Sequence, residues 1–211
     1  MKTKYDEEKL DISNVRDSFN LVLMGDSSVG KTSILERYCN DFFKKEKCSR
    51  KTIQIYKKIV TFPDNSYQLK FWDTPPKSMD NCNKSQINML YNCDGIIYVC
   101  SYDNSDSLKH INTWYQFLTQ YIDFSTKEMI LLINKKDLKE GEGKAITEEQ
   151  IYKKSKDLQL EYYEISAKTG ENVFDGIKII IDKLIERCND RSRGSNSDSI
   201  NEQEKGGCNI I

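Results

Sequence analysis

A short loop near the N-terminus holds the residues best suited to chemistry in this chain of 211 residues. It lies between an apolar stretch at 19–24 and a helical pattern from 31, and its spacing is G-x4-G-K-T. In such a loop, backbone N–H groups and a helix N-terminus point into one concavity that fits a polyphosphate. We expect Lys31 to meet the outer phosphates and the Thr32 hydroxyl to bind Mg²⁺. The predicted nucleotide-binding residues here are Gly25, Asp26, Ser27, Ser28, Val29, Gly30, Lys31, Thr32 and Ser33.

Two further polar loops each follow a predicted strand. The first reads N-K-x-D and the second S-A-K, and together they contribute Asn134, Lys135, Asp137, Ser166, Ala167 and Lys168. A carboxylate accepts two hydrogen bonds from the N1 and N2 groups of guanine, whereas adenine has no such pair of donors. Asp137 is therefore predicted to select the base, and the backbone N–H of Ala167 to meet the guanine oxygen. The alkyl stems of Lys135 and Lys168 would cover the faces of the base.

Apolar runs alternate along the chain with longer amphipathic stretches. Strands are predicted at 19–24, 53–62, 67–72, 95–100, 128–133 and 161–165, and helices near 31–39, 79–91, 106–123, 147–157 and 172–188. This alternation predicts an α/β fold with a six-stranded, mostly parallel, doubly wound sheet and helices on both faces. The short turn at 63–65 makes the second and third strands a hairpin, which places one antiparallel strand at an edge. Ligands bind at the carboxyl ends of the strands in such sheets, where the motifs above lie.

Composition and charge exclude several classes of function. The net charge is -1, so no basic field favours nucleic acid. The seven cysteines are odd in number and include no C-x-x-C pair, which favours reduced cytosolic thiols over a disulfide framework or a zinc site. The sequence shows no signal-peptide core and no apolar run of membrane-spanning length. We expect a cytoplasmic protein with a polar extension at 1–17, one domain at 18–188 and a disordered polar tail at 189–211.

Residues 18–188 resemble a small GTPase of the Ras superfamily, and among its branches they are most similar to Rab. The similarity lies first in the nucleotide motifs. It also includes Trp72 within 71–74, the stretches 95–99 and 112–114, and a polar tail that ends near Cys208. The resemblance implies the P-loop small-GTPase fold, GTP or GDP with Mg²⁺ as cofactors, and a monomeric switch or scaffold in vesicle trafficking. Its implied partners are effector and exchange-factor proteins, which would bind the surface from 53 to 72 and the loops beside it.

The resemblance also implies roles for single residues outside the three motifs. Thr52 would bind Mg²⁺ together with Thr32, and Asp73 would reach the ion through water. Phe43 matches an aromatic residue that lies edge-on against guanine, with a hydrophobic anchor for its loop as the alternative role. The only histidine, His110, is expected on the third helix, away from the phosphates, in a surface or packing role.

The segment after the third strand departs from the family pattern D-[TA]-x-G-Q. Pro76 stands at the glycine position and has no N–H to donate to the γ-phosphate. Lys77 stands at the glutamine position, and an ammonium cannot accept a hydrogen bond from the attacking water. No catalytic residue is therefore assigned, and GTP hydrolysis is predicted to be weak. Two alternatives remain: a conventional GTP-hydrolysing switch with an unusual catalytic arrangement, and a P-loop kinase or adenine-nucleotide hydrolase, against which the guanine motifs argue.

The last four residues, which begin with Cys208, have the form of a C-a-a-X prenylation box. A single lipid binds membranes only marginally, and the tail at 189–207 carries no polybasic patch that could supply a second signal. We therefore expect reversible attachment through Cys208 to the cytosolic face of an internal membrane, with protein partners selecting the membrane.

Overall fold

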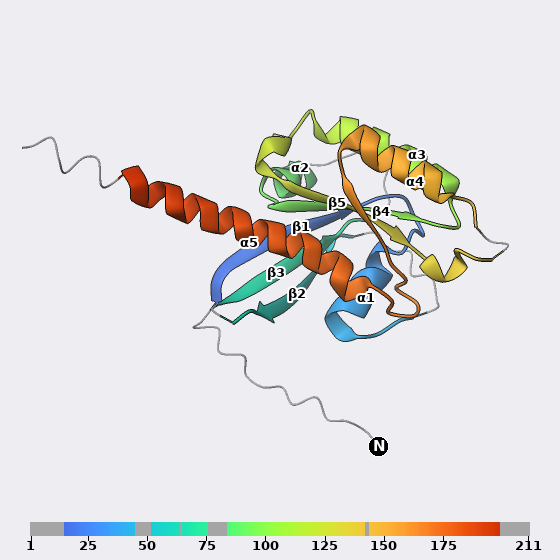
Figure 1. Cartoon of the computed structure of the whole chain (residues 1–211), viewed down its shortest axis with the longest axis horizontal. Helices are drawn as coiled ribbons and strands as arrows, with labels where there is room; N and C mark the ends of the chain where they lie inside the picture. The colour runs from blue at the N-terminus through green and yellow to red at the C-terminus, as the bar shows by residue number, and fades with distance from the viewer. Residues whose placement is uncertain (1–14, 45–51, 64, 76–83, 142–143, 199–211) are drawn as a thin grey trace, which may run out of the picture.

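A six-stranded sheet in the order β2-β3-β1-β4-β5-β6 forms the centre of the protein, as the computed structural model shows (Figure 1). The structure describes residues 15–44, 52–63, 65–75, 84–141 and 144–198. The strands are β1 (Val15–Met24), β2 (Gln54–Thr61), β3 (Ser66–Asp73), β4 (Gly95–Ser101), β5 (Glu128–Asn134) and β6 (Glu161–Glu164). Strands β2 and β3 pair antiparallel, and all other neighbours in the sheet pair parallel. The predicted mostly parallel sheet with one antiparallel edge strand is thereby confirmed.

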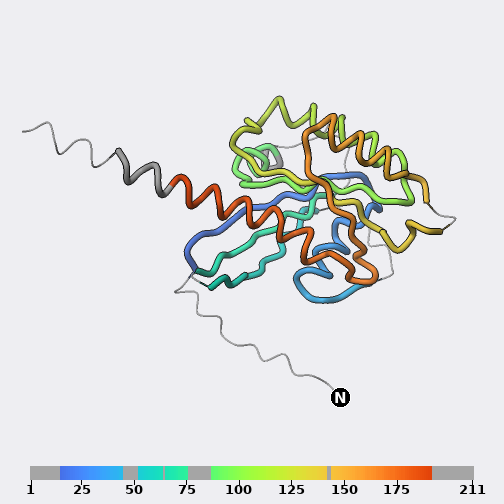
Figure 2. Tube along the Cα trace, in the orientation of Figure 1, coloured from blue at the N-terminus to red at the C-terminus, as the bar shows by residue number. Residues whose placement is uncertain are grey.

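Helices cover both faces of the sheet. They are α1 (Lys31–Asn40), α2 (Lys84–Tyr91), α3 (Ser105–Leu118), α4 (Glu148–Leu158) and α5 (Val173–Asp198), with short 3-10 turns η3 (Phe124–Thr126) and η4 (Lys136–Leu138). Figures 1 and 2 show α1 and α5 on one side and α2, α3 and α4 on the other. The buried side chains form two clusters with the same division of helices, so the chain is doubly wound as predicted.

The two clusters follow from the alternation of side chains along the strands. In β1, Leu21 and Leu23 pack with α1 and α5, whereas Val22 and Met24 pack with α2, α3 and α4. Successive side chains of a strand point to opposite faces. Every residue of β4 is buried, as expected for a central parallel strand that has helices on both sides.

Two elements are longer than the sequence predicts. Strand β1 begins at Val15 because its polar first half pairs with β3, beginning opposite Ser66. Helix α5 runs to Asp198, whereas the sequence analysis places a disordered tail from 189 onward. Asn189 is tied to the sheet, since Arg16 Nη1 donates a hydrogen bond to its Oδ1 atom at 2.9 Å. No proline interrupts the segment, and adding a turn to an existing helix avoids the cost of nucleation, although its glycine, serine and asparagine residues are weak helix formers.

The edge strand β2 is fastened to the helices beside it by Lys58. Its Nζ atom donates a hydrogen bond to the backbone oxygen of Tyr38 at 2.6 Å. The same ammonium lies 4.6 Å from the centre of the Tyr38 ring and 5.1 Å from that of Phe174, within cation–π range. Because Tyr38 belongs to α1 and Phe174 to α5, one lysine joins three elements.

Within the described part of the chain, no helix combines the length and apolar character needed to cross a bilayer. The described cysteines, which are Cys39, Cys93, Cys100 and Cys188, carry free thiols. Burial raises the pKa of Cys39 and Cys93 to about 11. These two side chains are therefore protonated near neutral pH and are poor nucleophiles.

Candidate functional site

Two glycines shape the G-x4-G-K-T segment at 25–32, which joins β1 to α1 and is called the phosphate-type loop below. Gly25 has φ of 148° and Gly30 has φ of 98°, both in the region that favours glycine. A Cβ atom on Gly25 would lie 2.2 Å from the carbonyl oxygen of Val99, and one on Gly30 would lie 2.2 Å from Nδ2 of Asn134. The loop is thus held against β4 on one side and against the end of β5 on the other.

Lys31 lies inside this loop and is 6% exposed. Its ammonium donates hydrogen bonds to the backbone oxygens of Gly25 at 2.6 Å and Asp26 at 2.8 Å. Burial lowers its pKa to about 8, although the negative charges of Asp73 and Asp26 oppose the shift. A buried ammonium surrounded by loop carbonyls is suited to receive an anion with several charges.

An oxygen pair suited to a divalent cation lies next to the loop. The hydroxyl of Thr32 donates a hydrogen bond to Oδ2 of Asp73, which is 5% exposed at the carboxyl end of β3. The hydroxyl of Thr74 donates to the backbone oxygen of Leu23 at 2.6 Å, so the ends of β1 and β3 are fixed side by side. Thr52 lies exposed in the bend before β2, outside the pair that Thr32 and Asp73 form. The structure therefore brings together two of the three predicted metal ligands.

Asn134 joins all three predicted nucleotide loops and is 2% exposed at the end of β5. Its Nδ2 atom donates to the backbone oxygen of Val29 at 2.8 Å, and its Oδ1 atom accepts from the backbone N–H of Ala167 at 3.0 Å. The N–H that the sequence analysis assigns to the guanine oxygen is thus bonded to Asn134 in this structure. A guanine oxygen would have to accept a hydrogen bond from the same Ala167 N–H, either together with Asn134 Oδ1 or in its place.

Asp137 is held from two sides beside Asn134. Its Oδ1 atom accepts a hydrogen bond from the Ser166 hydroxyl at 2.6 Å, and its Oδ2 atom lies 3.3 Å from the Lys168 ammonium. The Asp137 side chain is 12% exposed, whereas that of Lys168 is 62% exposed. These contacts orient the carboxylate and leave it further lone pairs for two donors of a base.

Asp103 follows β4 and orients Lys135, a role that no motif in the sequence indicates. The Lys135 ammonium donates to Oδ2 of Asp103 at 2.7 Å, and the Ser101 hydroxyl donates to Oδ1 at the same distance. Burial alone would raise the pKa of Asp103, but the hydrogen bonds from Lys135 and Ser101 outweigh it and lower the pKa. Lys135 is further fixed by its left-handed backbone, with φ of 63°.

Arg37 is a second residue that the sequence analysis missed. It projects from α1 and donates to the backbone oxygen of Ala167 from Nε and to that of Lys168 from Nη2, each at 3.1 Å. These bonds anchor the S-A-K loop to the helix that follows the phosphate-type loop. A single arginine in a helical pattern gives no sequence signal of such a long-range contact, which spans 130 residues.

His110 lies on α3 with its side chain 54% exposed, as expected, but it also contacts the phosphate-type loop, which the sequence does not indicate. Its Nδ1 atom lies 2.7 Å from Oδ2 of Asp26, and Nε1 of Trp114 donates to the other carboxylate oxygen at 3.3 Å. The reason is the order of the sheet, in which β4 lies next to β1, so that α3 after β4 reaches the loop after β1.

Some of the other predicted site residues lie in the described part of the chain, and the rest lie outside it. Val29 is fully buried, and Ser27 and Ser28 are exposed on the loop, with Ser33 half-buried in the first turn of α1. Phe43 is half-buried and packs against the cluster of α1 and α5, which favours the role of a hydrophobic loop anchor. The predicted roles in GTP hydrolysis and lipidation concern Pro76, Lys77 and Cys208, which lie outside the described residues.

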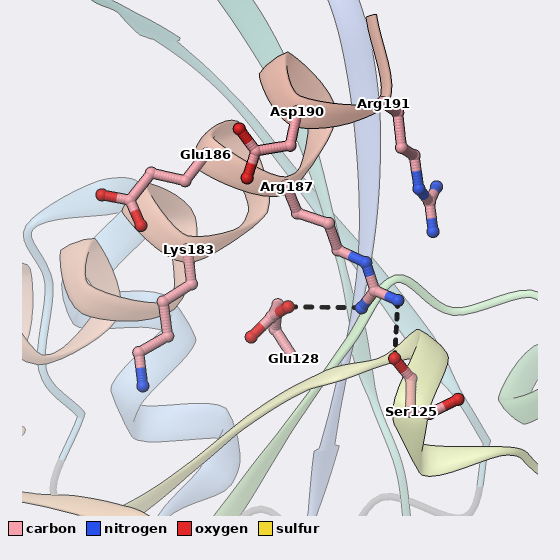
Figure 3. Close-up of a pocket in the computed structure, with 7 residues that line it drawn as sticks. All are labelled: Ser125, Glu128, Lys183, Glu186, Arg187, Asp190 and Arg191. Carbon is pink, nitrogen blue, oxygen red and sulfur yellow. Dashed lines mark hydrogen bonds and ion pairs between the residues drawn. The ribbon is translucent and has the colours of Figure 1, made fainter. Parts of the chain in front are cut away.

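A groove of about 600 Å³ lies beside α5, remote from these loops (Figure 3). Figure 3 shows Arg187 pointing from α5 to Glu128 and Ser125, with Nη1 to Oε1 of Glu128 at 3.2 Å and Nη2 to the Ser125 oxygen at 2.8 Å. Glu128 begins β5, whereas the nucleotide motifs follow the carboxyl ends of the strands. The Arg187 contacts hold α5 to the amino end of β5. This is the end of the sheet opposite to the one where the nucleotide motifs lie.

Comparison with known proteins agrees with this geometry. Residues 20–186 match the family model described as the Ras family. The human protein "Ras-related protein Rab-3D" is 30% identical over 185 residues, which cover 87% of this chain and 81% of that protein. Rab-3 of Caenorhabditis elegans is 29% identical over 190 residues, with 89% and 82% covered. Rab-32D of Dictyostelium discoideum is 30% identical over 189 residues, with 87% and 81% covered.

The chain therefore belongs to the Ras family of small GTPases. Within the superfamily it is a Rab-like protein, because its similarity to Rab-named relatives extends over most of its length.

Proposed function

We propose that this protein binds guanine nucleotides and acts as a membrane-attached switch or scaffold in vesicle trafficking. The observation that carries the binding proposal is the position of Asn134, which bonds both the loop of Val29 and the loop of Ala167. The phosphate-type loop after β1 and the carboxylate of Asp137 after β5 are thereby held together at the carboxyl ends of their strands, which β4 separates in the sheet.

The oxygen donors of the site fit Mg²⁺ as the cation that accompanies the nucleotide. Thr32 and Asp73 offer a hydroxyl and a carboxylate, and Mg²⁺ prefers such oxygen ligands together with phosphate oxygens. When bound, Mg²⁺ would offset the negative charge of the phosphates. Thr32 would bind the ion directly and Asp73 would reach it through water, Thr52 from the bend before β2 would be a further ligand, and Lys31 would bind the outer phosphates.

Competition for bound fluorescent GDP tests the choice of base. We expect unlabelled GDP and GTP to displace the probe at equal or similar concentrations, and ATP to fail at a thousandfold excess, because adenine offers no donor pair to Asp137. Asp137→Asn should weaken GDP binding by at least about tenfold, since one acceptor is lost where the base donates. Displacement of the probe by ATP at concentrations near those of GDP would refute the guanine assignment and favour the kinase or adenine-nucleotide alternative.

The proposed cellular role follows the names of the relatives, which include "GTP-binding protein Rab-3D" of Rattus norvegicus. Effector and exchange-factor proteins would bind the hairpin of β2 and β3 and the segments beside it. This surface exposes 47% of Ile55 and leaves Trp72 half-exposed, so it offers apolar area to a partner. Hydrolysis of GTP would be slow because of Pro76 and Lys77, which favours a long-lived GTP state over rapid cycling. A conventional switch is the alternative.

Reversible membrane attachment would depend on the thiol of Cys208. In lysate that contains prenyltransferases, we expect the natural protein to sediment with membranes and Cys208→Ser to remain in the supernatant, because the thioether anchor cannot form. Cys188→Ser is the matched control, since Cys188 lies in α5 and its thiol contacts Asp17. If Cys208→Ser sediments with membranes as fully as the control, attachment does not depend on this lipid.

A further inference from the structure

The phosphate-type loop carries a carboxylate close to the place where phosphates are expected. Asp26 follows Gly25, and its backbone oxygen accepts a hydrogen bond from the Lys31 ammonium at 2.8 Å. The charge of the Asp26 carboxylate opposes the lowering of the Lys31 pKa, whose main cause is burial, so the two charges lie within range of each other. Phosphates bound beside Lys31 would therefore feel a like charge, which is unfavourable at short distance.

Both oxygens of the Asp26 carboxylate are occupied by α3. Oδ2 lies 2.7 Å from Nδ1 of His110, and Oδ1 accepts a hydrogen bond from Nε1 of Trp114 at 3.3 Å. His110 and Trp114 are one helical turn apart, so they lie on the same face of α3. The Asp26 side chain is only 20% exposed, which makes these bonds matter more than they would in open solvent.

The helix that holds the carboxylate is firmly positioned. The Asn104 side chain caps the first turn of α3 by accepting from the backbone N–H groups of Asp106 and Ser107. The Ser107 hydroxyl accepts from the backbone N–H of Ser101, which ties α3 to the end of β4. Trp114 packs against the buried cluster of this face. The helix therefore places both donors next to Asp26, with Trp114 packed on the cluster and the His110 side chain 54% exposed.

We propose that His110 and Trp114 are positioning residues of the nucleotide site, which hold the Asp26 carboxylate against α3 and keep its charge away from the phosphates. This inference rests on the proposed function. Removal of the two donors frees the carboxylate to turn back toward the loop, where it repels the nucleotide. The effect grows with the number of phosphates, so GTP is affected more than GDP.

The test is the dissociation rate of fluorescent GDP and of a fluorescent, non-hydrolysable GTP analogue. His110→Ala with Trp114→Phe removes both donors while the ring at 114 remains, and it is expected to raise the dissociation rate of GDP by about tenfold and that of the GTP analogue by more. Adding Asp26→Ser to this pair removes the freed charge. It is expected to slow dissociation again by at least about fivefold. Asn112→Ala, an exposed change on the same helix, is the control for general damage to α3.

Rescue by Asp26→Ser is the outcome that a merely structural contact does not give, because a serine restores none of the lost bonds. If the triple variant releases nucleotide as fast as the double variant, or if GDP and GTP analogue are affected equally, the inference is overturned. Failure of the natural protein to bind either probe would instead overturn the proposed function, so the two failures are distinct.

Discussion

The double variant Pro76→Gly with Lys77→Gln is expected to hydrolyse preloaded GTP at least about tenfold faster than the natural protein in a single turnover with Mg²⁺. Glycine restores a backbone N–H that can donate to the γ-phosphate, and glutamine restores a group that can accept a hydrogen bond from water. Loss of one such donor to a developing charge costs other enzymes about a hundredfold or more, so a tenfold gain is a conservative expectation.

Lys77→Gln alone separates the two contributions, because it returns the water-orienting group without the donor to phosphate. We expect it to gain less than the double variant. The affinity for GDP is measured first in the natural protein and in both variants. If it is equal, differences in rate reflect hydrolysis and not the fraction of protein that holds nucleotide. If the natural protein already turns over as fast as the double variant, another residue positions the water, and the conventional-switch alternative is favoured.

Asn134→Ala is expected to lower the affinity for GDP by at least about a hundredfold. The change removes two buried hydrogen bonds, one to the backbone oxygen of Val29 and one from the backbone N–H of Ala167. Without the amide the two loops must be ordered when GDP binds, and an ordering cost of about 3 kcal/mol corresponds to a factor of about a hundred in affinity. Isothermal titration of the nucleotide-free protein with GDP measures the loss.

Glu171→Gln is the matched control for this variant. Glu171 pairs with Lys136 at 2.5 Å and so connects the same two loops, those after β5 and β6, but at the surface. Exposed ion pairs contribute about 0–1 kcal/mol, and the affinity should change by less than about fivefold. If Asn134→Ala binds GDP as well as Glu171→Gln does, the buried amide is not what holds the site together.

The sequence predicts the elements that position the site because their signals are local. The apolar runs of β1, β4 and β5 and the turn between β2 and β3 each lie within a few consecutive residues, and the structure confirms their order and direction. Glycines at 25 and 30 carry a local signal as well, since the backbone there has positive φ. The loops that follow these strands therefore come together where the fold class places them.

The side-chain contacts that complete the site could not be predicted in the same way. Asp103 orients Lys135 across 32 residues, and Arg37 reaches the oxygen of Ala167 across 130. No periodicity encodes such pairs, because they depend on which elements become neighbours in the sheet. His110 shows the consequence, since its place on a helix is predictable whereas its contact with Asp26 follows from the position of β4 beside β1.

The ends of the outer elements show a different kind of error. A polar composition from residue 189 onward predicts a tail, yet α5 continues to Asp198. Helix propagation depends on the turn before it as well as on composition, and Asn189 also bonds to Arg16 of β1. This tertiary contact lies at the first polar turn and is a feature that composition alone does not indicate.

The anchoring of β2 by Lys58 makes the stretch between α1 and β2 a chain closed between fixed ends. Its start is fixed where the N–H of Asp41 bonds the last turn of α1, and the strand that it enters is held to Tyr38 and Phe174. The contacts that fix the two ends involve none of the residues 45–51, so they do not depend on how many residues lie between them. Residues can therefore be added between these ends with little loss of stability, and the surface offered to partners can diverge while the sheet stays the same.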